Sequence, residues 1–179
     1  MTLPVLQQPK LGNAPVASSV IDERNQLPTR LNGWETSSYP YRSRPIAGVT
    51  GGRAHYTAGP VSSTTRNIAN YQVGPTAQDP FPAIAYHYLV EGDGSVHWCH
   101  DLDKRVWGSG QPGSNESDVH VCYTGDTQPN GRQLDGIKTA LRHAQGVLGK
   151  KLSIKAHRDG YSTACPGPTW ELWRSAVLP

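Results

Sequence analysis

The 179-residue sequence predicts an α/β (α+β mixed) fold in which a central mixed β-sheet is flanked by helices. Two observations support this class: short runs of alternating apolar residues recur after about residue 45, and segments with helical periodicity lie between them. The 19 glycines and 15 prolines predict many turns and long loops around this regular structure. The length is that of a single domain with tails.

The first part of the chain differs from the rest in composition. Residues 1–42 are rich in Pro, Gln, Ser and Asn and show little periodicity, so we interpret them as an irregular N-terminal extension with at most one helical turn near SVIDERNQ. The opening MTLPVLQQPKLGNAP lacks the charged start, apolar run and cleavage site of a signal peptide. We therefore expect synthesis in the cytoplasm.

The next segments predict a strand, a helix and a hairpin in that order. PIAGVTGGRAHYTAG indicates a glycine-interrupted strand that ends near His55. A helix capped by a serine or threonine among residues 62–64 follows, with Ile68 and Tyr71 on one face. The alternating runs IAYHYLVE and SVHWCHDL, joined by residues 92–94, then indicate a β-hairpin.

The C-terminal half continues the alternation of strands and helices. After the glycine-rich loop WGSGQPGSN, the run VHVCYTG predicts a strand, and RQLDGIKTALRHAQGVLGKK has the clearest helical period of the chain. KLSIKAH predicts a short strand that ends at His157. A last helix begins with Pro168 in its first turn and places Trp170, Trp173 and Val177 on one apolar face.

Charge, hydropathy and cysteine content exclude several classes of function. The net charge is +3 without a basic run longer than two residues, so we expect no nucleic-acid partner. No window of about 18 apolar residues occurs, which argues against membrane insertion. Cys99, Cys122 and Cys165 are too widely spaced for a disulfide framework. Cys122 lies in a strand-like run, where a buried hydrophobic role is usual.

Two of the seven histidines share a context that suggests a metal site. His55 and His157 each close a strand that opens into a loop of Gly, Ser and Thr, and Cys165 follows in a loop held by Pro166 and Gly167. Two imidazoles and one thiolate would leave a tetrahedral zinc ion with one open position for water, which is the pattern of a catalytic site. The spacing of His157 and Cys165 is not that of a zinc finger, so spacing alone leaves open whether they are unrelated neighbours.

Five segments carry a resemblance to a known family. RAHYTAG, IAYHYLVEGDGSV, WGSG with Asn115, VHVCYTGD and KAHRDGYSTACPG occur in the order and spacing of the zinc-dependent N-acetylmuramoyl-L-alanine amidases. From about residue 45 to 179 the sequence resembles this family, which includes phage endolysins and the animal peptidoglycan recognition proteins. The resemblance implies an amidase/peptidoglycan-recognition-like single domain, a zinc amidase catalytic domain, at residues 43–179.

The resemblance also implies roles for individual residues. His55, His157 and Cys165 match the three ligands of one Zn²⁺ ion, and Tyr86 matches the family tyrosine whose hydroxyl points toward the metal-bound water. Thr163 stands where the family has a lysine or a threonine, and many phage members carry lysine there. A neutral hydroxyl offers an oxyanion less stabilisation than a full positive charge, so we expect catalysis to depend more on zinc.

Four further positions bear on the site. Trp107 and Asn115 lie in a loop that resembles the cleft wall of the family, and they either contact glycan or peptide or serve loop packing and turn capping. His87 should point to the opposite face of its strand from Tyr86, which favours a structural role. Cytoplasmic recycling relatives carry a glutamate at the position of Cys122, so that additional carboxylate base is missing.

These inferences predict a monomeric enzyme that acts on bacterial peptidoglycan. It would cleave the amide between the lactyl group of N-acetylmuramic acid and L-alanine as a phage or prophage endolysin, made in the host cytoplasm and acting on the cell wall. A non-catalytic peptidoglycan-binding module of the same fold is one alternative. A cysteine peptidase that uses Cys99 is another, although Cys99 and His100 are consecutive on a strand and face away from one another.

Overall fold

The computed structural model describes residues 19–30, 41–77 and 80–179. The strands are β1 (Val20–Asp22), β2 (Gly51–Tyr56), β3 (Tyr88–Val90), β4 (Val96–Trp98), β5 (Asp118–Tyr123) and β6 (Ser153–Ala156). The helices are α1 (Thr65–Val73), α2 (Pro112–Ser117), α3 (Gly131–Leu148) and α4 (Trp170–Trp173), with 3-10 turns at Ile46–Gly48, His157–Asp159 and Arg174–Val177.

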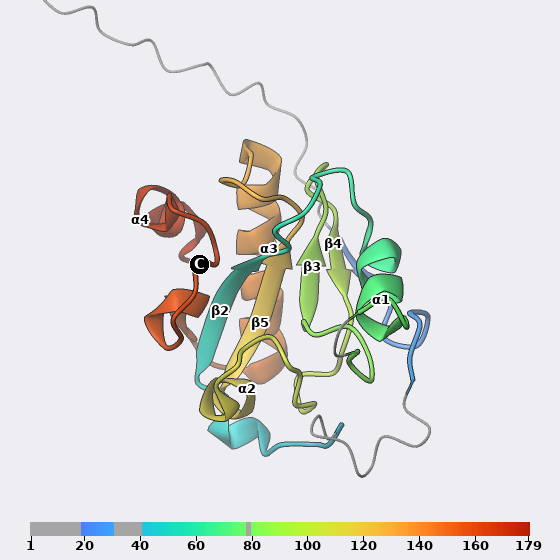
Figure 1. The fold of residues 1–179 in the computed structure, drawn as a ribbon. Coiled ribbons are helices and arrows are strands. Elements are labelled where there is room, and N and C mark those ends of the chain that lie inside the picture. The colour runs from blue at the N-terminus through green and yellow to red at the C-terminus, as the bar shows by residue number, and fades with distance from the viewer. Residues whose placement is uncertain (1–18, 31–40, 78–79) are drawn as a thin grey trace, which may run out of the picture.

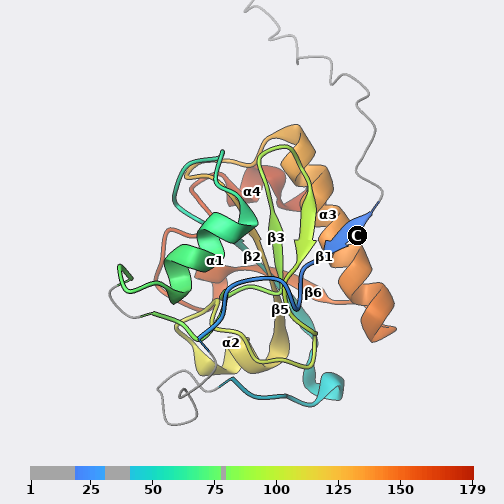
Figure 2. The same ribbon diagram turned by 90° about the vertical axis from the view of Figure 1, so that its right-hand side faces the viewer.

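The strands form one six-stranded sheet in the order β1-β4-β3-β5-β2-β6 (Figure 1). The pair β3 and β4 is antiparallel, as predicted for a hairpin, and the other pairs are parallel. Helices α1 and α3 cover opposite faces of this sheet (Figure 2). The predicted mixed sheet flanked by helices is therefore confirmed.

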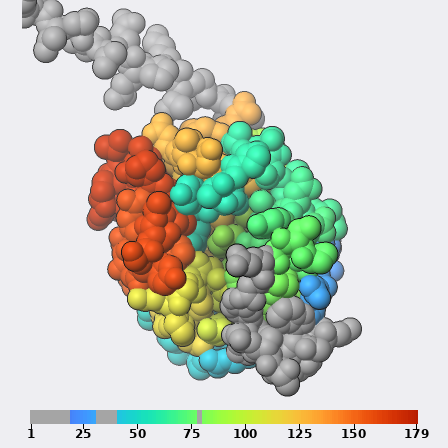
Figure 3. All heavy atoms as spheres, in the orientation of Figure 1, coloured from blue at the N-terminus to red at the C-terminus, as the bar shows by residue number. Residues whose placement is uncertain are grey.

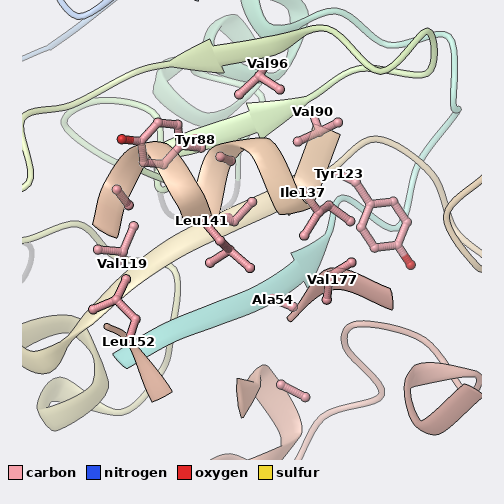
Figure 4. Close-up of a cluster of buried hydrophobic side chains, with 14 of the residues drawn as sticks. Ala54, Tyr88, Val90, Val96, Val119, Tyr123, Ile137, Leu141, Leu152 and Val177 are labelled. Carbon is pink, nitrogen blue, oxygen red and sulfur yellow. The ribbon is translucent and has the colours of Figure 1, made fainter. Parts of the chain in front are cut away.

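Because side chains alternate along the strands, one face of the sheet is apolar and the other face carries polar side chains. On the α3 side, Ala54 and Tyr123 pack with Ile137 and Leu141 of α3 in the main hydrophobic core (Figure 4). The next residue of β2, His55, points to the α1 side because successive strand side chains face opposite ways. The α1 side of the sheet therefore combines a smaller apolar cluster with buried histidines.

The long helix α3 spans the segment with the predicted helical period, and capping residues lie at both of its ends. The side chain of Asn130 accepts a hydrogen bond from the Gln133 N–H at 3.0 Å, and Gln133 Oε1 accepts one from the Asn130 N–H at 3.1 Å. Gly149 ends the helix in the left-handed conformation with φ 65°, where glycine is favoured. This capped helix gives the sheet a rigid support behind the polar face.

The N-terminal prediction is partly wrong. Val20–Asp22 form a strand instead of a helical turn, because they pair in parallel with β4, and the Glu23 N–H then donates to the Trp98 carbonyl at 3.0 Å. An open sheet edge supplies hydrogen bonds that a short isolated helical turn lacks. Residues 1–18 and 31–40 of the predicted extension lie outside the described residues.

Three local predictions also need correction. Helix α1 buries Ala69 and Val73, whereas the predicted contact residue Tyr71 is 62% exposed. The predicted loop WGSGQPGSN contains the start of α2, with a proline in its first turn. The last helix begins at Trp170, after Pro168, and the predicted apolar residues are buried in this helix and in the 3-10 turn that follows it. No helix of the described residues is long and apolar enough to cross a lipid bilayer.

Candidate metal centre

The three predicted ligands come together at one edge of the sheet. His55 lies near the end of β2, and His157 directly follows β6, the strand that pairs in parallel with β2. Parallel strands place their carboxyl ends at the same edge, which is where α/β sheets bind ligands. One side-chain ligand atom from each of His55, His157 and Cys165 lies within 4.8 Å of the others. Figure 3 shows teal atoms, from the part of the chain around and after the end of β2, beside the orange-red segment that follows β6.

The geometry of these side chains fits a zinc ion. His55 Nδ1 lies 3.7 Å from Cys165 Sγ, and ligands at about 2.0–2.3 Å from a tetrahedral zinc ion lie about 3.3–3.8 Å apart. The Nε2 atom of His157 is buried and has no hydrogen-bond partner among the described residues. A buried nitrogen without a partner is costly, and a cation at this point would satisfy it. Two imidazoles and a thiolate are also a donor set that zinc prefers.

The protonation of the site favours metal binding at the histidines more than at the cysteine. Burial lowers the pKa of His157 to about 4, and burial together with His120 and His157 lowers the pKa of His55 well below its ordinary value. Burial raises the pKa of the Cys165 thiol to about 11, although the Tyr56 N–H donates to its sulfur at 3.4 Å. Both imidazoles are therefore neutral ligands near neutral pH, whereas Cys165 must lose a proton.

Zinc binding is expected to release about one proton per ion at about pH 5.5, because Cys165 must be deprotonated, whereas both imidazoles are already neutral and a zinc-coordinated water with a pKa of about 7 keeps its proton. The thiol keeps its proton below its pKa in the metal-free protein and loses it in the complex, so affinity should rise about tenfold per pH unit between about pH 5 and 6.5. Below about pH 4, protonation of His157 should make this dependence steeper. Calorimetry at about pH 5.5 in buffers of different ionisation enthalpy measures the proton count, and a release of two protons at that pH would contradict the prediction.

The loop that carries Cys165 is held by its own hydrogen bonds. Thr163 Oγ1 accepts from the Cys165 N–H at 3.3 Å, and the Arg158 guanidinium donates to the carbonyls of Ala164, at 2.6 Å, and Gly167. The Arg158 N–H also donates to the Cys165 carbonyl at 3.1 Å. Because the Thr163 hydroxyl accepts through its oxygen, its hydrogen is left to donate. The sequence analysis did not identify Arg158. The only signal for it in the sequence was its position next to His157.

Tyr86 lies beside the ligand cluster. Its ring centroid is 5.4 Å from that of His55, and its side chain is half-buried against the apolar cluster that contains Cys122. Burial, followed by the proximity of Cys122 and Cys165, raises the pKa of Tyr86 well above its ordinary value. The hydroxyl therefore keeps its proton near neutral pH and can act as a hydrogen-bond donor at the site.

The other two predicted site residues lie inside the protein. Trp107 is 5% exposed and packs against Tyr41 and Phe81. Asn115 is 4% exposed, and its side chain accepts from the Ser109 N–H at 3.0 Å and donates to the Ser109 carbonyl at 2.7 Å. These contacts favour loop packing and turn capping over contact with a substrate.

The remaining cysteines and His87 occupy structural positions. Cys122 is fully buried in the α1-side cluster, as predicted for a small hydrophobe. Cys99 is 1% exposed, and burial raises the pKa of its thiol far above its ordinary value, which is unfavourable for a nucleophile. His87 is fully buried, and its Nδ1 atom accepts from the His120 N–H at 3.0 Å. These observations argue against the cysteine peptidase alternative, because the thiol of Cys99 is buried and keeps its proton.

Sequence reasoning missed two buried residues behind the ligands. Arg53 forms an ion pair with Asp118 at 2.6 Å, and His120 Nδ1 lies 2.8 Å from His55 Nε2. Burial, followed by His87 and Arg44, lowers the pKa of His120 well below its ordinary value, so its ring is neutral. The alternation of side chains within DVHVCY places His120 on the same face of the strand as Cys122. This alternation is a signal in the sequence that could have identified His120 as a neighbour of the site. The pairing of β5 with β2, which brings His120 to His55, was not available from the sequence.

The fold is an α/β domain that brings together, at the carboxyl ends of its strands, three residues that could hold a metal ion. The chain belongs to the N-acetylmuramoyl-L-alanine amidase family, because the model of that family matches residues 44–168. The family resemblance predicted from the five sequence segments is thereby confirmed. None of the curated proteins matches the sequence.

Solved structures share the fold at low sequence identity. The Ph2119 endolysin from a bacteriophage of Thermus scotoductus is 21% identical with a TM-score of 0.64, over 90% of this chain and 100% of that one. The Drosophila peptidoglycan recognition protein SD is 24% identical with a TM-score of 0.61, over 71% of this chain and 79% of that one. The amidase LysC from Clostridium intestinale is 15% identical with a TM-score of 0.63, over 90% and 99%.

Proposed function

We propose that this protein is a zinc-dependent peptidoglycan amidase that hydrolyses the amide between the lactyl group of N-acetylmuramic acid and L-alanine. The observation that carries the proposal is the cluster of ligand atoms from His55, His157 and Cys165, all within 4.8 Å of one another, in a member of the amidase family. The buried Nε2 of His157, which has no hydrogen-bond partner among the described residues, supports it. Zinc, when bound, supplies Lewis acidity and lowers the pKa of a coordinated water toward about 7.

The protein's own residues have separate tasks in this proposal. His55, His157 and Cys165 hold the ion at the sheet edge. Tyr86, which keeps its proton, donates a hydrogen bond toward the oxygen that becomes negatively charged as the amide is attacked. Thr163 braces the Cys165 loop through its oxygen and offers its hydrogen to the same developing charge or to the leaving nitrogen.

The biological role proposed is host lysis by a phage or prophage endolysin. All three cysteines of the chain are free and buried, so the fold is held without disulfides. Secreted proteins of the same size often depend on disulfides, and their absence favours a protein that folds in a reducing cytoplasm. The substrate, bacterial peptidoglycan, would then be reached from inside the host cell.

Digestion of purified peptidoglycan with and without a chelator tests the proposed activity. We expect new N-terminal alanine, no new reducing sugar ends, loss of activity on chelation and recovery with added zinc. A non-catalytic binding module would sediment with peptidoglycan and release nothing. Activity that persists after complete removal of the metal would contradict zinc dependence.

Tyr86→Phe should lower kcat by about 10²- to 10³-fold, because it removes one donor to the developing oxyanion. The phenyl ring keeps its contact with His55, so zinc affinity should stay within about twofold of the wild-type value. Kinetics at saturating zinc together with a zinc titration measure the two effects. A variant with normal kcat would exclude the hydroxyl from the reaction.

Thr163→Val should lower kcat about tenfold at saturating zinc, because a neutral hydrogen bond contributes about 1–1.5 kcal/mol. Valine has nearly the shape of threonine without its hydroxyl, whereas Thr163→Ser keeps the hydroxyl and should retain activity. If both variants are fully active, the loop contributes the Cys165 ligand and no further chemistry.

A further inference from the structure

A row of buried hydrogen bonds leads from helix α2 to the metal site. His120 Nε2 lies 3.3 Å from the Ser114 carbonyl oxygen, and His120 Nδ1 lies 2.8 Å from His55 Nε2. The other nitrogen of His55, Nδ1, faces Cys165 Sγ at 3.7 Å. His120 is fully buried and His55 is 1% exposed, so water does not compete for these contacts.

The order of donors and acceptors along this row follows from its first member. A carbonyl oxygen can only accept, so the proton of the neutral His120 ring is on Nε2 and its Nδ1 has a lone pair. His55 Nε2 must then donate to that lone pair. A neutral His55 with its proton on Nε2 presents a lone pair at Nδ1, which is the atom that faces Cys165.

The position of His120 is itself fixed by the surrounding backbone. Its N–H donates to His87 Nδ1 at 3.0 Å, and the two rings stack with centroids 5.9 Å apart. A Cβ atom on residue 108 would lie 2.4 Å from His120 Nδ1, so the space for the ring exists because this residue is Gly108. The ring therefore has little freedom to turn away from His55.

We propose that His120 is a positioning residue that fixes the tautomer and orientation of His55, so that His55 binds the metal through Nδ1. The inference rests on the proposed function in one respect, the assignment of His55 as a metal ligand. It adds a residue that contacts neither substrate nor metal and acts through His55. Partners that orient a metal-binding histidine typically contribute about 10- to 100-fold to metal affinity.

Zinc affinity, measured by competition with a chromophoric chelator, tests this role without an activity assay. His120→Phe keeps a ring of similar size but removes the acceptor for His55 Nε2, and we expect zinc to bind about 10- to 100-fold more weakly. In His120→Asn the amide oxygen can take the place of Nδ1 as acceptor, so affinity should recover to within about threefold of the wild-type value. His143→Phe, at a half-buried histidine outside the site, is the matched control and should bind zinc normally.

The outcomes separate this inference from the proposed function. If the wild-type protein does not bind zinc, the proposed function fails. If it binds zinc and His120→Phe binds equally well, the positioning role is overturned while the proposed function stands. Nitrogen-15 NMR of the metal-free wild-type protein adds a test that needs no variant, which matters if His120→Phe does not fold. A His55 proton on Nε2 is expected, and a proton on Nδ1 would overturn the inference.

Discussion

Cys165→Ala is expected to abolish tight zinc binding and to lower kcat/KM for peptidoglycan by about 10³-fold or more. The magnitude follows because a catalytic zinc ion contributes several kcal/mol to transition-state stabilisation, and about 4 kcal/mol corresponds to about 10³-fold in rate. The side chain is 7% exposed and lies in a loop held by backbone hydrogen bonds, so alanine should leave the fold intact. Zinc content after dialysis and release of N-terminal alanine measure the two effects.

Cys99→Ala is the matched control for this prediction. Cys99 is another buried cysteine, 1% exposed, but it lies in the apolar cluster on the α1 side and is not among the ligands. We expect it to bind zinc normally and to retain activity. Loss of activity in Cys99→Ala, together with full activity in Cys165→Ala, would favour the cysteine peptidase instead.

Arg53→Leu is expected to lower the free energy of unfolding by about 3–5 kcal/mol, because it leaves a buried carboxylate without its partner. Arg53 is 4% exposed and Asp118 is completely buried, and their ion pair joins β2 to β5. Arg53 also donates to the Ala156 carbonyl at the end of β6 at 2.7 Å. The residue thus links β5 to β2 and β6, the two strands that lead to the candidate ligands His55 and His157.

Arg42→Ala is the exposed counterpart, because Arg42 forms an ion pair with Glu116 at the surface. A pair of this kind typically contributes less than about 1 kcal/mol, so the two variants should differ clearly in urea-induced unfolding. A loss below about 1 kcal/mol in Arg53→Leu would show that the Asp118 carboxylate finds another partner or takes up a proton.

Much of the site could be predicted because its residues carry signals of their own. His55, His157 and Cys165 stand where strands open into loops of small residues, and Tyr86 and Thr163 were assigned by the order of five segments. The arrangement of β1 could not be predicted, because its pairing depends on the exposed edge of β4, a partner about 75 residues away in the chain. Trp107 and Asn115 show the same limit, since a loop sequence does not say which of its side chains the fold will bury.

The sequence by itself determined the class of fold, the position of its main helix and the identity of the three candidate ligands. These follow from local patterns: period, capping residues and the residues that flank strand ends. Only the tertiary structure decided which groups lie behind the ligands, because the pairing of β2 with β5 brings Arg53 to Asp118 and His55 to His120. Such contacts join residues 65 positions apart, and the free energy that selects them comes from burial and strand pairing over the whole sheet.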